Sequence, residues 1–195
     1  PFSLMKEYIP LLAESGKQFL VLGNMNHITF KEIFHYFREN KMWLGYNAGH
    51  FWFKVPDYYE AKNTDYKQDE DGQKWRRLGN ICWFTNMDID IRHQFLDLYK
   101  HFSIQEYPEY DNYDAYFVKT VADIPCDTDK PLAVPITFLS SFSPDQFELL
   151  DANQFRKYDE VPVKSHGLIK DKDGTIKGKA TYARLLVRNR NPEKE

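Results

Sequence analysis

The side chains best placed for chemistry are amides that follow short apolar runs. Asn24 and Asn26 come directly after the run 19–22, and Asn86 ends the run 78–86. The run 19–22 has the composition of a central parallel strand buried on both faces, and open α/β sheets bind ligands at the carboxyl ends of such strands. We therefore expect the three asparagines to border one ligand-binding cleft. The alternative is ordinary turn asparagines.

Two groups of cations could contact a polyanion. Arg76 and Arg77 follow Lys74 and Trp75, and adjacent cations beside an aromatic ring suit phosphate contact and stacking. The chain carries a net charge of −3, yet residues 161–195 hold nine Lys and Arg against four Asp and Glu. The cations that could track a DNA backbone there are Lys164, Lys170, Lys172, Lys177, Lys179, Arg184, Arg188 and Arg190. A solvated charged loop or hairpin is the alternative for both groups.

Composition limits the class of protein. The apolar fraction of 42% and the charged fraction of 28% are ordinary for a soluble globular chain, while the aromatic fraction of 16% is high. Cys82 and Cys126 lie far apart and the six histidines show no ligand spacing, so no metal site is predicted. Two lone thiols are typical of a reducing compartment, and we expect a cytoplasmic protein. No apolar run approaches the roughly 18 residues of a membrane span.

The elements that position these groups alternate between helix and strand. Residues 3–15 form a predicted amphipathic helix capped by Ser3, and Pro10 predicts a kink or break near Ile9. A capping box predicts a second helix over 29–40, and 41–46 follows as a strand. This alternation predicts half of a doubly wound α/β sheet with right-handed crossovers.

The later elements are less regular. The runs 51–55 and 78–86 could pair as a hairpin, and the polar stretch 57–74 between them is expected to be a long mobile loop. A Ser-Pro start predicts a short helix over 144–150. Asp-Gly at 173–174 predicts a second hairpin.

Together these stretches resemble the EcoRI-type adenine-specific DNA methyltransferases. Pro1-Phe2, followed by a helix and a strand, is similar to the second half of the Asn-Pro-Pro-Phe motif in the active-site loop of that family. The similarity extends to about residue 150 and is carried by 1–4, 19–26, 29–47, 51–56, 74–76, 78–86, 107–114 and 134–139.

The resemblance implies methyl transfer from S-adenosylmethionine to the exocyclic N6 of an adenine extruded from double-stranded DNA, in a restriction–modification system. By that resemblance Phe2 matches the ring that stacks on the extruded base, and Pro1 matches the second proline of the loop. The motif's Asn and first Pro, the Gly-rich cofactor loop and the acidic ribose ligand are all absent from this chain. We therefore expect the cofactor to be bound mainly by a part missing from this chain, and the chain alone to be inactive.

The expected fold is α/β. Residues 1–90 would form the carboxyl-terminal half of a Rossmann-like S-adenosylmethionine-dependent methyltransferase sheet, and 91–195 an irregular, strand-rich extension that contacts the DNA target. A half sheet leaves an unpaired strand edge, so self-association is also expected. One alternative is a non-catalytic DNA-binding or protein-interaction module of the same ancestry. Another is an aromatic-rich carbohydrate-binding domain, which explains the Tyr and Trp residues but not the α/β first half.

Overall fold

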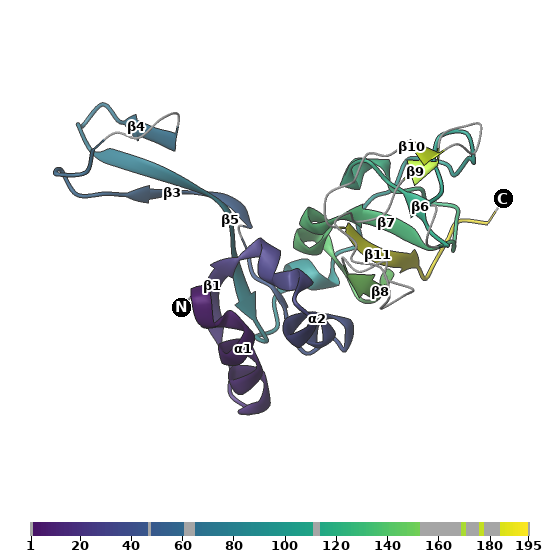
Figure 1. Cartoon of the computed structure of the whole chain (residues 1–195), viewed down its shortest axis with the longest axis horizontal. Helices are drawn as coiled ribbons and strands as arrows, with labels where there is room; N and C mark the ends of the chain where they lie inside the picture. The colour runs from purple at the N-terminus through teal and green to yellow at the C-terminus, as the bar shows by residue number, and fades with distance from the viewer. Residues whose placement is uncertain are drawn as a thin grey trace.

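The chain folds as a mixed α/β protein with two sheets in separate lobes. The computed structural model describes residues 2–46, 48–60, 65–110, 114–152, 169–170, 176–177 and 184–194. One sheet has five strands and the other has four, and a two-stranded hairpin lies beside the second. Figure 1 also shows a long ribbon that projects from the first lobe. In the part of the chain that the structure describes, no helix has the length and apolar character needed to cross a membrane.

The first helix runs without interruption. A 3₁₀ turn, η1 (Phe2–Leu4), leads into α1 (Met5–Glu14), which passes through Pro10. The predicted break is therefore wrong. Burial of Met5 and Ile9 against the sheet holds the helix, although the proline lacks one backbone donor. The helix begins after Leu4, not at a Ser3 cap, and the chain reverses at Gly16, whose φ is +68°.

The second helix begins with a turn that the sequence did not predict. A 3₁₀ segment, η2 (Met25–Thr29), precedes α2 (Lys31–Arg38). The predicted capping box does not form, because the Thr29 hydroxyl donates to the Asn26 carbonyl at 2.8 Å. The predicted apolar face of the helix is confirmed: Ile33, Phe34 and Phe37 are all buried.

One long strand is the centre of the first sheet. β5 (Lys74–Thr85) pairs through its second half with β1 (Leu20–Asn24) and with β2 (Trp43–Leu44). Through its first half it pairs with β3 (Gly49–Lys54) and β4 (Tyr66–Gln68). All four pairings are antiparallel, so β1 and β2 run parallel to each other with β5 between them.

This topology corrects two predictions and confirms a third in part. β1 is not a central strand with parallel neighbours: among the described residues it pairs only with β5, and Leu20 is 51% exposed. The stretch 57–74 is not one long loop, since it contains β4 and a tight turn closed by the Asp69 N–H donating to the Gln73 carbonyl. The predicted hairpin between 51–55 and 78–86 is confirmed in part: β3 pairs with β5, but residues 52–54 lie opposite 75–77, before the predicted run.

The second sheet has the order β6-β7-β11-β8. Its strands are β6 (Tyr116–Phe117), β7 (Leu132–Pro135), β8 (Phe147–Ala152) and β11 (Arg184–Asn189). The 3₁₀ turn η4 (Asp90–His93) lies between β5 and β6, while η5 (Val121–Asp123) follows β6 and η6 (Ile136–Ser141) follows β7.

The predicted helix over 144–150 is wrong, because the segment forms β8. Ser143 still starts a turn, with its carbonyl accepting from the N–H groups of Gln146 and Phe147. From there Phe147 and Leu149 alternate into the core while the backbone pairs with β11. Local turn chemistry gave no sign of this distant partner. The predicted hairpin near residues 173–174 is confirmed by β9 (Ile169–Lys170) and β10 (Ile176–Lys177).

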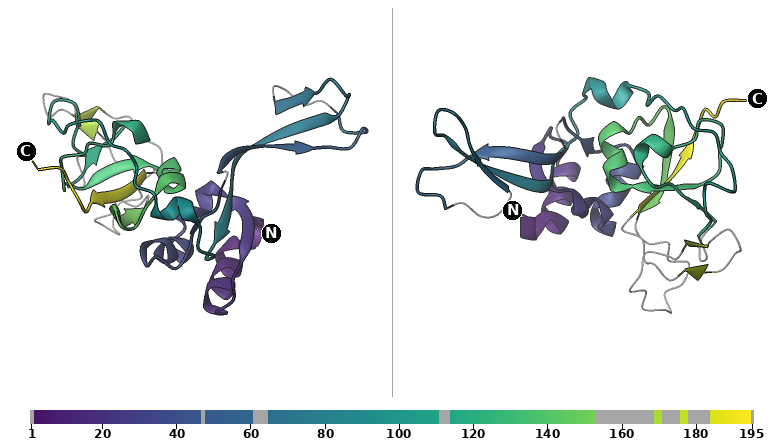
Figure 2. Two further views of the ribbon diagram at one scale, coloured as in Figure 1. Left: turned by 180° about the vertical axis from the view of Figure 1, so that it is seen from behind. Right: turned by 90° about the horizontal axis from the view of Figure 1, so that it is seen from above.

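The two sheets share one hydrophobic core. Its buried cluster joins Phe37 and Phe84 of the first lobe to Phe138 and Phe147 of the second. Phe37 meets Phe84 edge-on at 6.0 Å between ring centroids, and Phe138 meets Phe147 in the same manner at 5.0 Å. Figure 2 shows α2 lying between the lobes, where it packs against β8.

Candidate functional site

Three segments meet at one edge of the first sheet. β1 ends at Asn24, level with Ile81 of β5, and β3 begins at Gly49 at the same level. The N-terminal turn η1 reaches this edge too, because α1 runs back along β1 (Figure 1). We call this the substrate edge. Ligands of α/β sheets gather at the carboxyl ends of the strands, and this is the carboxyl end of β1.

Close packing at Gly23 brings the start of α1 onto β1. A Cβ atom placed on Gly23 would lie 2.6 Å from Cε2 of Phe84 and 2.9 Å from Cε of Met5. Any larger residue would force the buried Phe84 ring or the end of the Met5 side chain to shift, so glycine is favoured here. The contact fixes Met5, and therefore the backbone at Phe2, near the end of β1.

Asn24 and Asn26 form a turn at the substrate edge. The Asn24 Oδ1 accepts the Asn26 backbone N–H at 2.9 Å, and Asn24 caps η2. This is the turn role that asparagine commonly takes after a strand. The Asn26 side chain remains exposed at the edge.

His27 lies behind these asparagines and was not predicted as a site residue. It is 8% exposed, and its ring centroid is 5.2 Å from that of Phe30. Burial lowers the pKa of His27, which favours a neutral imidazole. The spacing of the histidines in the sequence did not indicate a role for His27. Its position directly after Asn26 was the one signal that could have placed it at this edge.

Asn86 lies at the opposite end of the sheet, so its predicted place in the cleft is wrong. Its Oδ1 accepts the Phe19 N–H at 2.9 Å, and its Nδ2 donates to the Lys17 carbonyl at 2.9 Å. β5 is antiparallel to β1, so the end of β5 meets the start of β1. Asn86 therefore ties down the entry to β1.

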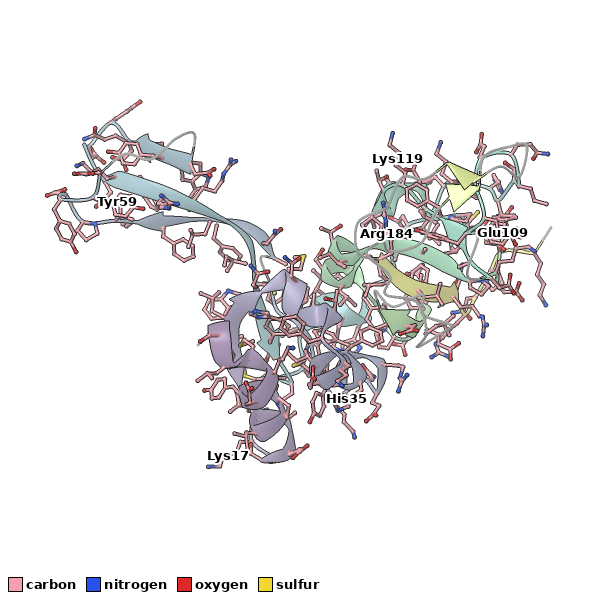
Figure 3. All side chains as sticks on the ribbon, in the orientation of Figure 1. Lys17, His35, Tyr59, Glu109, Lys119 and Arg184 are labelled. Carbon is pink, nitrogen blue, oxygen red and sulfur yellow. The ribbon has the colours of Figure 1, made fainter. Side chains whose placement is uncertain are left out.

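Arg76 and Arg77 lie on a ribbon that continues past the substrate edge. The ribbon consists of β3, β4 and residues 74–78 of β5, and Figure 3 labels Tyr59 within it. Arg77 forms an ion pair with Asp65 at 2.7 Å. The guanidinium of Arg76 lies 5.8 Å from the ring centroid of Tyr59.

The C-terminal cations are not one exposed surface. Arg184 is only 8% exposed, and its Nη1 donates to the Val118 carbonyl at 3.0 Å. Its guanidinium lies 4.6 Å from the Phe117 ring centroid, and burial lowers its pKa. The prediction that Arg184 follows a DNA backbone is therefore wrong: Figure 3 places it inside the second lobe.

Some of the other predicted cations lie within the described residues, and some lie outside them. Arg188 is partly exposed and faces Glu148 at 3.4 Å. Lys170 and Lys177 lie on the hairpin strands β9 and β10. Outside the described residues are Pro1, Lys164, Lys172 and Lys179.

His101, Cys126 and Asp127 meet in the second lobe, although their spacing predicted no cluster. Their potential ligand atoms all lie within 4.8 Å of one another. The Asp127 carboxylate is already engaged, because Oδ1 accepts the Phe102 N–H at 2.7 Å and Oδ2 lies 3.1 Å from His101 Nδ1. Burial raises the pKa of the Cys126 thiol. We interpret the group as a hydrogen-bonded cluster that supports the loop at residue 101.

Comparison with known proteins gives a consistent result over nearly the whole chain. The family model described as "Adenine-specific methyltransferase EcoRI" matches residues 1–190. The chain is 41% identical over 198 residues to Type II methyltransferase M.EcoRI of Escherichia coli, which covers 100% of this chain and 57% of that relative. It is 35% identical to Type II methyltransferase M.MpnI of Mycoplasma pneumoniae over 97% of this chain and 62% of the relative.

A third relative shows the same proportions. Type II methyltransferase M.MgeORF184P of Mycoplasma genitalium is 35% identical over 96% of this chain and 62% of its own length. No solved structure matches the chain significantly. The chain thus spans 57% to 62% of the length of these relatives.

Proposed function

Because the chain belongs to the family of EcoRI adenine-specific methyltransferases, we propose that it is part of a DNA adenine N6-methyltransferase of a restriction–modification system. The methyl group of S-adenosylmethionine would move to the exocyclic amine of an adenine extruded from the duplex. The single observation that carries the proposal is the family match over residues 1–190. The meeting of η1, Asn24 and Asn26 at the substrate edge supports it.

The chemistry needs positioning more than activation by a charged group. The lone pair of the adenine amine is delocalised into the ring, so the amine is a poor nucleophile. An aromatic ring that stacks on the extruded base holds it, and such stacking is worth roughly 1–3 kcal/mol. The sulfonium methyl then needs in-line approach. We assign the stacking ring to Phe2, with Pro1 before it in the loop, and contact with the DNA strand to Asn26.

We propose that the cofactor is bound mainly outside this chain. The sequence holds no Gly-rich loop after a strand, and Gly23 is occupied by packing against Phe84. The first sheet would be the carboxyl-terminal half of a Rossmann-like methyltransferase sheet, with residues 1–90 as the partial catalytic domain. Residues 91–195 would be the target-recognition region. On this proposal the isolated chain transfers no methyl group.

The free edge of β1 leads to a second expectation for the isolated chain. β1 pairs only with β5 among the described residues, and an unpaired edge is a template for another strand. We propose that the protein is cytoplasmic and that the isolated chain self-associates through β1 in a reducing buffer. Light scattering is the test, and a monodisperse monomer would contradict it.

The test of function uses the complete gene product that carries this chain. Methyl transfer from labelled S-adenosylmethionine to duplex DNA is measured, and N6-methyladenine is identified by mass spectrometry. Phe2→Ala should lower kcat/KM on the order of 10- to 100-fold, because it removes the stacking ring. Phe2→Tyr should keep most of the activity, and Phe95→Ala, at an exposed ring of the second half, is the control. Transfer to cytosine contradicts the proposal, and DNA binding without transfer favours the non-catalytic module.

A further inference from the structure

We propose that the ribbon is an arm that grips duplex DNA, and that one of its faces contacts the phosphate backbone beside the substrate edge. The inference rests on the proposed function, in which DNA is the substrate, and it adds the surface that holds it. We call that surface the tryptophan face. It consists of Trp52, Lys54, Lys67, Trp75 and Arg77.

Strand register puts these five side chains on one face. Residues directly opposite each other in an antiparallel pair point to the same side of the sheet. Trp52 is opposite Arg77, Lys54 is opposite Trp75, and Lys67 is opposite Trp75 from the other side. The neighbouring positions Phe51, Phe53 and Leu78 therefore lie on the other face.

Each cation of the tryptophan face lies over an indole ring. Lys67 Nζ is 4.7 Å from the ring centroid of Trp52 and 5.7 Å from that of Trp75. Lys54 Nζ is 5.3 Å from the Trp75 centroid, and the Arg77 guanidinium is 5.7 Å from the Trp52 centroid. A cation within about 6 Å of an indole centroid is attracted by the negative face of the ring, which favours this placement. The face thus presents a row of pre-positioned cations.

Two acidic side chains contact the other members of the face. Asp65 pairs with Arg77, and Asp69 accepts the Trp75 Nε1–H at 2.8 Å. Lys54 and Lys67 are exposed and form no ion pair among the described residues. We therefore assign the phosphate contacts to these two lysines.

The opposite face has a different chemistry. Phe51 and Phe53 stack with ring centroids 6.0 Å apart, and Leu78 is 40% exposed. The two faces of the ribbon are therefore not equivalent. Arg76, opposite Phe53, and Lys74 also belong to this face, but both are engaged within the chain: the Arg76 guanidinium lies 5.8 Å from the Tyr59 ring centroid, and Lys74 Nζ donates to the carbonyls of Asp57 and Tyr59. The tryptophan face, whose two lysines form no ion pair among the described residues, therefore suits a phosphate backbone better.

The position of the ribbon fits a duplex that reaches the substrate edge. β5 continues from the body into the ribbon without a break, and β3 leaves the body level with the end of β1. Figure 2 shows the ribbon extending away from both lobes on the side of the N-terminus. A duplex with its target base at Phe2 would pass along the ribbon.

The test compares two charge-matched double variants of the whole chain. Lys54→Gln with Lys67→Gln removes both proposed phosphate contacts. Lys17→Gln with Lys41→Gln removes the same charge from exposed lysines that precede β1 and β2, at the far edge. Figure 3 shows Lys17 distant from the ribbon. Binding to a fluorescent duplex is measured by anisotropy from about 50 to about 200 mM salt.

The arm variant should bind roughly tenfold more weakly and should lower the slope of log affinity against log salt by about 1.8, or about 0.9 for each lost phosphate contact. The control should keep the wild-type slope and affinity within roughly twofold. Circular dichroism and the tryptophan emission of the arm variant must match the wild type. As a second variant, Trp52→Phe keeps an aromatic ring, should retain binding and should reduce the quenching of tryptophan emission by DNA.

Two outcomes overturn the inference and leave the proposed function to its own assay. Equal slopes for the arm variant and the control would show that the arm makes no phosphate contact. A wild-type chain that binds an acidic peptide but no duplex would show that the partner is a protein. Methyl transfer by the complete gene product, measured separately, distinguishes both from a failure of the proposed function.

Discussion

At the scale of single residues, the substrate edge depends on a position without a side chain. Gly23→Ala places a methyl group 2.6 Å from the ring of Phe84, which is fully buried and cannot move aside. We expect the variant to lose about 1–3 kcal/mol of unfolding free energy, as overpacked cores do. Urea denaturation of the two proteins measures it. A loss below about 0.5 kcal/mol would show that Met5 and Phe84 yield at this site.

His27 makes the stability of the protein depend on pH. Burial lowers its pKa from 6.5, so the unfolded chain takes up a proton at a higher pH than the folded chain does. The unfolding free energy therefore falls as the pH falls from 6.5 through the lowered pKa, at up to about 1.4 kcal/mol per pH unit. Denaturation at about pH 7.5 and about pH 5.5 should show a larger loss for wild type than for His27→Gln. Equal losses would assign the pH dependence to other groups.

Residue type alone did not separate the asparagines of the candidate site. Asn24 and Asn86 both end apolar runs, and the sequence placed them in one cleft. The strand direction of β5 decides the difference: it carries Asn86 to the start of β1, where it binds Phe19 and Lys17. Arg184 was misplaced for a similar reason, since β11 is an inner strand of its sheet.

At the scale of elements, β5 contains the bend from which the ribbon departs. Between the levels of Ile81 and Leu78, β5 holds one more residue than β3, and Asn80 there has a φ of 55°. A β-branched residue in this conformation costs about 1–2 kcal/mol, so Asn80→Val should destabilise the protein by that amount. Asn80→Gly should be neutral or stabilising. The urea concentrations at the unfolding midpoints of the two variants and the wild type measure both effects. Equal midpoints for all three proteins would show that the backbone conformation at Asn80 does not determine the bend.

Local signals predicted the elements that depend on neighbours in the sequence. The helices α1 and α2 and the pairing of β3 with β5 follow from amphipathic spacing and adjacent apolar runs. The insertion of β5 between β1 and β2 depends on residues far apart in the chain, and spacing carries no information on it. The same applies to β8, whose partner β11 lies more than thirty residues later and whose turn resembles a helix start.

At the scale of the whole molecule, the shared core should make both lobes unfold together. Phe147 is fully buried in the second lobe and belongs to the cluster that includes Phe37 and Phe84 of the first. Phe147→Ala should therefore cost about 3–5 kcal/mol. The tryptophan emission, from Trp43 and Trp83 in the first lobe and Trp52 and Trp75 in the ribbon, should change at the same denaturant concentration as the far-ultraviolet signal of the chain. Separate transitions would contradict a shared core.

The bend at Asn80 limits which insertions and deletions in β5 would keep the orientation of the ribbon. Side chains alternate along β5 from the body into the ribbon, so a single inserted or deleted residue near Asn80 would exchange the tryptophan face with the opposite face, which carries Phe51 and Phe53. Every residue type would be preserved, yet the cations would point the opposite way. A change of two residues would restore the original side at a different distance from the body. The ribbon therefore depends on the number of residues near Asn80 as well as on their types. An even change in that number alters the distance of the tryptophan face from the body, and an odd change turns the face to the other side.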